Sequence, residues 1–243
     1  MRNVWIIASK EFRQYFISPV AYAVATLIFL ILGGIFFINV YFAIRGSQID
    51  PDGRLVLGPL VTILLFATPA LTMRLLAEEQ RMGTIELLLT APVRDWEVVV
   101  GKWFGALLFM LVVIAFTWVY PLILNRMTSP GIDQGVLVSA YLGLVLLVAT
   151  MLAIGVLVSA LLTNPVAAFF VALALLLALW IVGSLGSGAG AGSLVASNLS
   201  LVDHYYNNFY RGIITTPDTL YFVSLTVLAL VLGSQVVESR RWR

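Results

Sequence analysis

The residues that could carry chemistry in this chain are few, and they form no recognisable catalytic set. The single histidine, His204, follows Asp203, but no cysteine, second histidine or His-Glu-x-x-His pattern accompanies it, so a solvated or interfacial histidine is expected. A phosphate-binding loop needs Gly-x-x-x-x-Gly-Lys-Ser/Thr, whereas the one Gly-Lys pair, at Gly101, is followed by tryptophan. Residues 183–193 are rich in glycine but contain no lysine, so they indicate a linker. We therefore predict no catalytic residue, no metal site and no ATP-binding loop.

The densest group of charged side chains lies in residues 74–102, which hold nine of the 26 formal charges. Gly83 breaks the helix that extends from the preceding apolar run, Thr84 can cap a short helix over 85–90, and Pro92 ends it. The apolar members of this short helix are Leu87, Leu88 and Leu89, and the surrounding charges are Glu78, Glu79, Arg81, Glu86 and Arg94. Three consecutive leucines need a surface to bury against. The element is therefore either a docking helix for another protein or a helix lying on membrane headgroups.

The elements that position this loop are predicted from hydropathy. The chain is 61% hydrophobic and 11% charged, against about 25% charged residues in soluble domains. A membrane-spanning helix needs about 20 apolar residues. Runs without Asp, Glu, Lys or Arg, divided once at Asn164-Pro165, predict six spans at about 19–42, 55–77, 103–125, 136–162, 165–185 and 217–238. We expect one all-α membrane domain over residues 1–243, with a kink at Pro69 in the second span.

Basic residues are distributed unequally between the two sides that six spans create. With the N-terminus in the cytoplasm, the inner segments carry ten of the 14 Lys and Arg residues and the outer segments carry four. The positive-inside rule then predicts that both termini lie in the cytoplasm. No charged residue falls at the centre of a predicted span, which disfavours a proton-coupled secondary transporter. A net charge of +2 gives no indication of a nucleic-acid partner.

Two amphipathic segments flank the spans. Residues 3–16 fit a helix lying in the membrane plane, although a short leader to the first span is the alternative. Its apolar face includes Trp5, Phe12 and Phe16, and its basic face includes Lys10 and Arg13. Gly33-Gly34 and Gly101-x-x-x-Gly105 permit close helix packing without indicating a partner.

Residues 194–216 alternate aromatic and polar side chains. The aromatic ones include Tyr205, Tyr206, Phe209 and Tyr210. Backbone within lipid must be hydrogen-bonded, so we expect one or two short helices that rest on the outer ends of the spans. They form either a gate at the exit of a pathway or an aromatic collar that anchors the last two spans.

The charged stretch resembles the cytoplasmic loop of type-2 ATP-binding-cassette (ABC) exporter permeases. The subfamily pattern is close to Glu-Glu-x-x-x-Gly-Thr-x-Glu-x-Leu-Leu-x-x-Pro, followed by Gly-Lys at the third span. It is matched here by Glu78, Glu79, Gly83, Thr84, Glu86, Leu88, Leu89 and Pro92, then by Gly101 and Lys102. Residues 10–22 and 203–225 are similar to the gliding-motility (GldF-like) permease subfamily.

The resemblance implies an ATP-driven exporter subunit in the bacterial inner membrane. It would form half of a translocation pathway, with an identical or related permease as the other half. A pair of separate ATPase subunits would bind ATP and Mg, so this chain needs no cofactor. The implied ATPase-coupling residues are Glu78, Glu79, Gly83, Thr84, Glu86, Leu87, Leu88, Leu89 and Pro92, and residues 3–16 would be the elbow helix. The alternative is an ATPase-linked assembly or scaffold factor that moves no solute.

Overall fold

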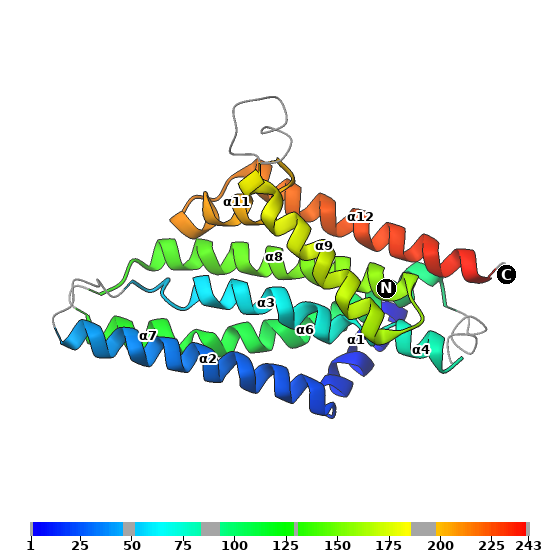
Figure 1. The fold of residues 1–243 in the computed structure, drawn as a ribbon, viewed down its shortest axis with the longest axis horizontal. Helices are drawn as coiled ribbons and strands as arrows, with labels where there is room; N and C mark the ends of the chain where they lie inside the picture. Colours follow the sequence, from blue (N-terminus) through cyan, green and yellow to red (C-terminus); the bar gives the residue numbers. More distant parts are fainter. Residues whose placement is uncertain (1, 46–51, 84–92, 129–130, 186–197, 242–243) are drawn as a thin grey trace.

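The computed structural model describes residues 2–45, 52–83, 93–128, 131–185 and 198–241. In these ranges all regular secondary structure is helical, and six helices are long and apolar enough to cross a membrane (Figure 1). The predicted fold class, an all-α protein with six membrane-spanning helices, is confirmed.

The helices have the following bounds. In chain order they are α1 (Arg2–Tyr15), α2 (Pro19–Ile44), α3 (Leu57–Thr72), α4 (Ala77–Arg81), α6 (Asp95–Thr117), α7 (Val119–Met127), α8 (Gln134–Leu161), α9 (Pro165–Leu185), α11 (Leu201–Tyr206), the 3-10 turn η1 (Phe209–Arg211) and α12 (Thr216–Arg241).

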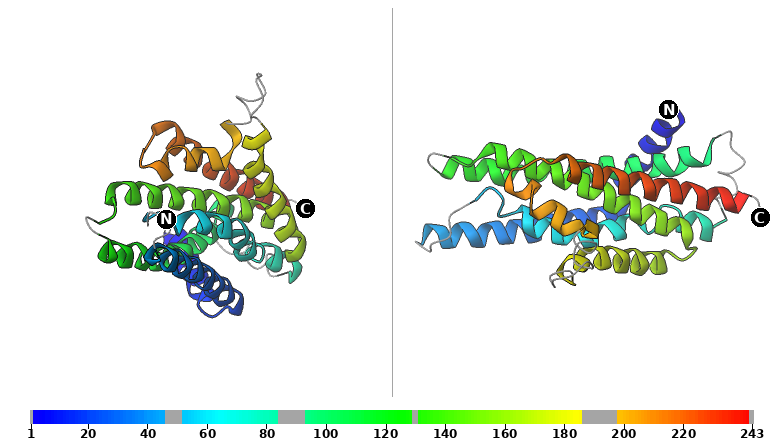
Figure 2. Two further views of the ribbon diagram at one scale, coloured as in Figure 1. Left: turned by 60° about the vertical axis from the view of Figure 1, so that its left-hand side comes forward. Right: turned by 90° about the horizontal axis from the view of Figure 1, so that it is seen from above.

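Successive long helices run in alternating directions. Helices α1 and α4 and both chain termini therefore lie at one end of the bundle, which we call the termini end (Figure 1). The last turns of α2 and α7 lie at the other end, which we call the distal end. Figure 2 shows α1 projecting from the side of the bundle at the termini end.

Local sequence explains where several helices begin and end. Pro19 occupies the first turn of α2, where its missing N–H costs nothing. The Asp133 carboxylate accepts the N–H groups of Gly135 and Val136 at the start of α8. The long apolar run is divided by Asn164, whose side chain accepts the N–H of Val166 at the start of α9.

Two spans differ in detail from the prediction. Helix α3 continues through Pro69 and ends three residues later, and four residues of turn separate it from α4. Helix α6 begins at Asp95, eight residues before the predicted start of the third span. Its extra turns are helical because the N–H of Arg94 donates to the carboxylate of Glu97, which caps the helix, and acidic side chains favour a helix N-terminus.

Helix α8 lies at the centre of the bundle, in contact with α3, α6, α9 and α12. In its most apolar stretch 72% of the residues are buried, compared with 11% for α2. Because lipid is as apolar as leucine, the exposed apolar side chains of α2 are compatible with a bilayer.

Candidate functional site

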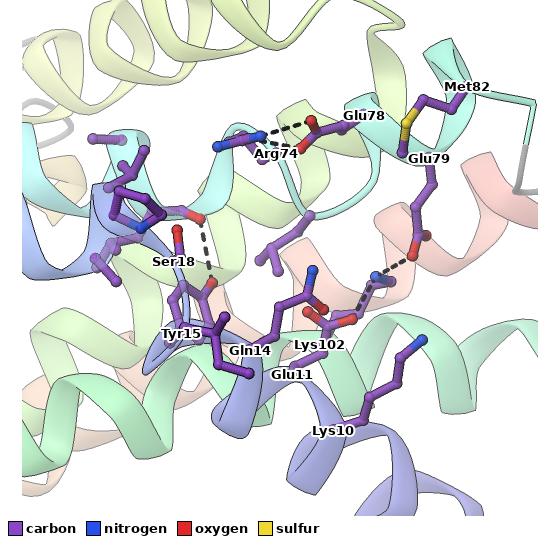
Figure 3. A pocket seen from close by; sticks show the side chains of 17 residues that line it. Lys10, Glu11, Gln14, Tyr15, Ser18, Arg74, Glu78, Glu79, Met82 and Lys102 are labelled. Atoms are coloured by element: carbon purple, nitrogen blue, oxygen red, sulfur yellow. Dashed lines mark hydrogen bonds and ion pairs between the residues drawn. The ribbon is translucent and has the colours of Figure 1, made fainter.

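A buried ion cluster joins three helices at the termini end. The ammonium group of Lys102, on α6, lies 2.8 Å from a carboxylate oxygen of Glu11 on α1 and 2.7 Å from one of Glu79 on α4 (Figure 3). The Lys102 side chain is only 3% exposed. A charge removed from water needs a partner of opposite sign. These three residues, which we call the ion cluster, therefore restrict how α1, α4 and α6 can move relative to one another.

Helix α1 packs closely against α6 because two glycines remove side chains between them. A Cβ atom at Gly101 would lie 2.8 Å from the side chain of Ile7, and one at Gly105 would lie 2.7 Å from the Cβ of Glu11. The Gly-x-x-x-Gly pattern is thus the docking surface for the N-terminal helix. Asn3 adds a hydrogen bond of 3.0 Å from its amide to the carboxylate of Glu97.

The last turn of α1 also contacts α3. The Tyr15 ring stacks on Phe109 of α6 with 5.0 Å between centroids, and its hydroxyl donates to the carbonyl of Leu71 at 3.2 Å. Burial raises the pKa of Tyr15, so this phenol remains a neutral donor.

The predicted apolar face of α1 is divided between two environments. Phe12 packs against the protein core, whereas Trp5 is 59% exposed and Phe16 is 40% exposed. The side of α1 that faces α6 carries Glu11, which lies between Ala8 and Tyr15 in the sequence. A charged residue can occupy this side because Lys102 pairs with it.

The interruption between α3 and α4 is stabilised by Ser159 on α8. Its hydroxyl accepts the N–H groups of Leu76 and Ala77, both at 3.0 Å, and donates to the carbonyl of Met73 at 3.2 Å. The amide of Gln80 donates to the carbonyl of Ala160 at 2.8 Å. Helix α4 is thereby anchored to the central helix, and the chain then reaches Gly83 in a left-handed conformation with φ +71.

The structure describes three of the predicted coupling residues. Glu78 forms a two-pronged ion pair with Arg74 at 2.6 and 2.7 Å, Glu79 belongs to the ion cluster, and Gly83 follows α4. The others, Thr84, Glu86, Leu87, Leu88, Leu89 and Pro92, lie outside the described residues. The first two glutamates of the motif therefore contact this chain itself.

A cavity of about 700 Å³ opens beside the ion cluster. It is bounded by α1, the turn into α2, and the end of α3 with α4 (Figure 3). Its lining combines charged groups, including Lys10 and Arg74, with apolar side chains such as Ile17 and Leu71.

The described part of the aromatic segment forms α11 and η1, which pack on α8. Tyr205 and Phe209 are fully buried, whereas Tyr206 and Tyr210 are partly buried. Phe209 lies against Gly143, and its carbonyl accepts a 2.9 Å hydrogen bond from Ser139. Burial, with Tyr210 nearby, raises the pKa of Tyr206 to about 12, so its hydroxyl is a neutral donor to the carbonyl of Gly58.

His204 is part of a polar cluster rather than a solvated side chain. Its Nδ1 lies 2.5 Å from the carboxylate of Asp218, its ring stacks on Tyr221, and Asn208 and Thr215 also donate to that carboxylate. The cluster joins α11 to the start of α12. Within the described ranges no group of three or more metal-binding side chains is found.

A comparison with known protein families matches almost the whole chain. A family model described as ABC-2 family transporter protein covers residues 5–236. The chain belongs to the ABC-2 transporter family. A search of curated proteins gives no match. Membership of the ABC-2 family identifies a membrane component of transport that is not itself catalytic, and it implies an ABC transporter permease.

Sequence reasoning missed the burial of Lys102 in this ABC-2 protein. It placed Lys102 in a cytoplasmic loop one residue before the third span, because the preceding charged residues conceal the extension of α6. Two signals could have found it. Lys102 lies between the two glycines of a helix-packing pattern, and Glu11 interrupts an apolar stripe on the N-terminal helix.

Proposed function

We propose that this chain is the permease subunit of an ATP-driven ABC exporter in the bacterial inner membrane. It forms half of the translocation pathway, and an identical or related permease forms the other half. Two ATPase subunits dock at the termini end, which faces the cytoplasm. The family match over residues 5–236 is the observation that carries this proposal. The similarity of residues 10–22 and 203–225 favours the GldF-like subfamily.

Residues 84–92 are the proposed contact with the ATPase, as a coupling helix. They follow directly after α4, which is held by the ion cluster and by the hydrogen bonds to α8. A force applied to this segment would reach α1 and α6 through Lys102 and α8 through Ser159. Each ATPase state must contact the two permease states with different free energy for such motion to occur.

Glu86→Gln and Leu88→Asp test the coupling role. Both changes should weaken ATPase association while membrane insertion stays normal. Loss of one partner from a buried charged contact costs about 2–5 kcal/mol, which corresponds to at least about 30-fold in affinity. Co-purification of the permease with a candidate ABC ATPase expressed in the same cells measures this effect. Arg45→Gln, at the distal end, is the control. Normal association of both variants would assign the segment to the membrane headgroups.

The second candidate is an ATPase-linked assembly or scaffold factor that moves no solute. Reconstitution of the permease and ATPase in vesicles distinguishes the two functions. An exporter should hydrolyse ATP faster with its substrate and accumulate that substrate in inside-out vesicles. Association with hydrolysis that no screened amphiphile stimulates would favour the scaffold.

A further inference from the structure

The cavity beside the ion cluster has the composition of a site for an amphiphile. Its charged lining comes from the termini end, where α1 and α4 lie. Its apolar lining comes from the first turn of α2 and from Ala70, Leu71 and Leu75 near the end of α3. Polar and apolar walls thus meet where the membrane spans begin. A volume of about 700 Å³ falls in the range of about 300–1,000 Å³ that small-molecule sites occupy.

The charges of the described lining residues cancel. The basic ones are Lys10, Arg74 and Lys102, and the acidic ones are Glu11, Glu78 and Glu79. Sites for anionic lipids are instead built from clusters of about 4–8 Lys and Arg residues. A balanced lining favours a ligand that carries both signs and no net charge.

Lys10 differs from the other five charged side chains. Each of those five forms an ion pair with another residue of the cavity, whereas Figure 3 draws no such contact for Lys10. Its side chain is exposed and extends from α1 beside the ion cluster. Among the described residues, therefore, no ion pair of Lys10 has to be displaced for an anionic group to reach this ammonium.

The cavity also has an apolar rim on the side of the α1–α2 turn. Ile17, which lines the cavity, is 80% exposed, and the neighbouring Phe16 is 40% exposed. In a membrane protein, large apolar side chains exposed at this level contact lipid. The rim therefore gives acyl chains access to the cavity.

We propose that this cavity binds a phospholipid with a zwitterionic ethanolamine headgroup from the adjacent leaflet. The phosphate lies against Lys10, the ammonium N–H groups donate to the carboxylates of the lining, and the acyl chains pass along Ala70 and Leu71. A quaternary choline group has no N–H to donate, so it binds less well.

Native mass spectrometry of the purified full-length chain tests the proposal. The chain is extracted from vesicles of equal phosphatidylethanolamine, phosphatidylcholine and phosphatidylglycerol, and the retained lipid is identified. Phosphatidylethanolamine should dominate. Lys10→Gln should lower its retention by up to about fivefold, the range of an exposed charge pair. Arg13→Gln removes the same charge from α1 outside the cavity and should leave retention unchanged.

A second variant tests the apolar part. Ala70→Phe fills the cavity and should lower retention of phosphatidylethanolamine without loss of the folded protein. Glycerophosphoethanolamine, which has the headgroup but no acyl chains, should not displace the lipid. Equal retention of phosphatidylcholine, preference for phosphatidylglycerol, or equal effects of Lys10→Gln and Arg13→Gln would overturn the proposal. Cross-linking of Lys10 to a second copy of the chain would also overturn the proposal.

Discussion

At the termini end, the packing of α1, α4 and α6 depends most on Lys102. Replacing it with methionine leaves the carboxylates of Glu11 and Glu79 close together and without their shared cation. Breaking a buried ion pair in this way costs about 3–5 kcal/mol. Lys102→Met should therefore lower the thermal stability of the detergent-solubilised protein strongly. Arg13→Met, on the exposed side of α1, is the control.

The double variant Glu11→Gln/Lys102→Met separates loss of a charge from loss of packing. The double variant leaves one carboxylate, Glu79, without its cation instead of two, so it should be more stable than Lys102→Met alone. Equal stability of the single and double variants would contradict the assignment of Glu11 as a partner.

Phe209 and Tyr206 distinguish a collar from a gate in the aromatic segment that contains α11 and η1. Phe209 is fully buried, and truncation of a buried Phe costs about 3–5 kcal/mol. Phe209→Ala should therefore lower yield and thermal stability together with activity. Tyr206 is partly exposed, so Tyr206→Ala should keep a folded protein. If the segment is a gate, this variant alters transport by the reconstituted complex; a collar would leave transport per folded molecule unchanged.

At the scale of elements, Gly105 allows α1 to dock on α6. A valine there would collide with the Cβ of Glu11 and the carbonyl of Ala8. Gly105→Val should release α1 and increase trypsin cleavage after Lys10 and Arg13 by about tenfold, since cleavage follows the population of the open form. Gly34→Val is a matched control, because a Cβ at Gly34 meets no atom within 4 Å. Equal cleavage of the two variants would contradict the docking surface.

The turn between α3 and α4 can be tested separately, through Ser159. Ser159→Ala leaves the N–H groups of Leu76 and Ala77 without their acceptor, at about 1–3 kcal/mol for each buried donor. The variant should lower the thermal stability and expose α4 to proteolysis after Arg81. Ser234→Ala, which removes only a bond to the carbonyl of Leu230 within α12, should have little effect.

The sequence predicted the features that depend on a single helix, such as its length and its ends. The lengths of the apolar runs indicate six membrane-spanning helices, and Asn164-Pro165 marks the break between α8 and α9. The sequence did not predict features that depend on contacts between helices far apart in the chain. The kink expected at Pro69 stays a prediction, whereas the turn after Thr72 was not predicted, and Ser159 of α8 satisfies the free N–H groups there.

The sequence predicted only part of the candidate site. The motif indicated Glu78 and Glu79 as functional residues, but it did not indicate that they pair with Arg74 and Lys102. A hydropathy profile gives every lysine the same polar value. It therefore cannot indicate that Lys102 pairs with Glu11, which lies 91 residues earlier. Likewise, Gly-x-x-x-Gly indicates close packing without naming the partner helix.

At the scale of the whole molecule, orientation in the membrane is the property to test. The structure brings both termini to one end, together with α1 and α4. Most basic residues belong to elements at that end, and Arg45, Arg54, Arg126 and Arg211 belong to the distal end. Reporter fusions at positions 50, 130 and 205 should report the outside, and a fusion at 90 should report the cytoplasm. A cytoplasmic signal at 205 would exclude the six-span orientation.

The ion cluster also has a consequence for the order of synthesis. Glu11 is made before its partner Lys102, which follows 91 residues later. At about 5–20 residues per second, the ribosome needs roughly 5–20 s to reach that lysine. During this interval the carboxylate lacks its Lys102 partner, so α1 must stay undocked at the membrane surface while two spans are made. Docking of α1 therefore has to follow the synthesis of α6, and nascent chains arrested before α6 should be recognised and degraded as incomplete.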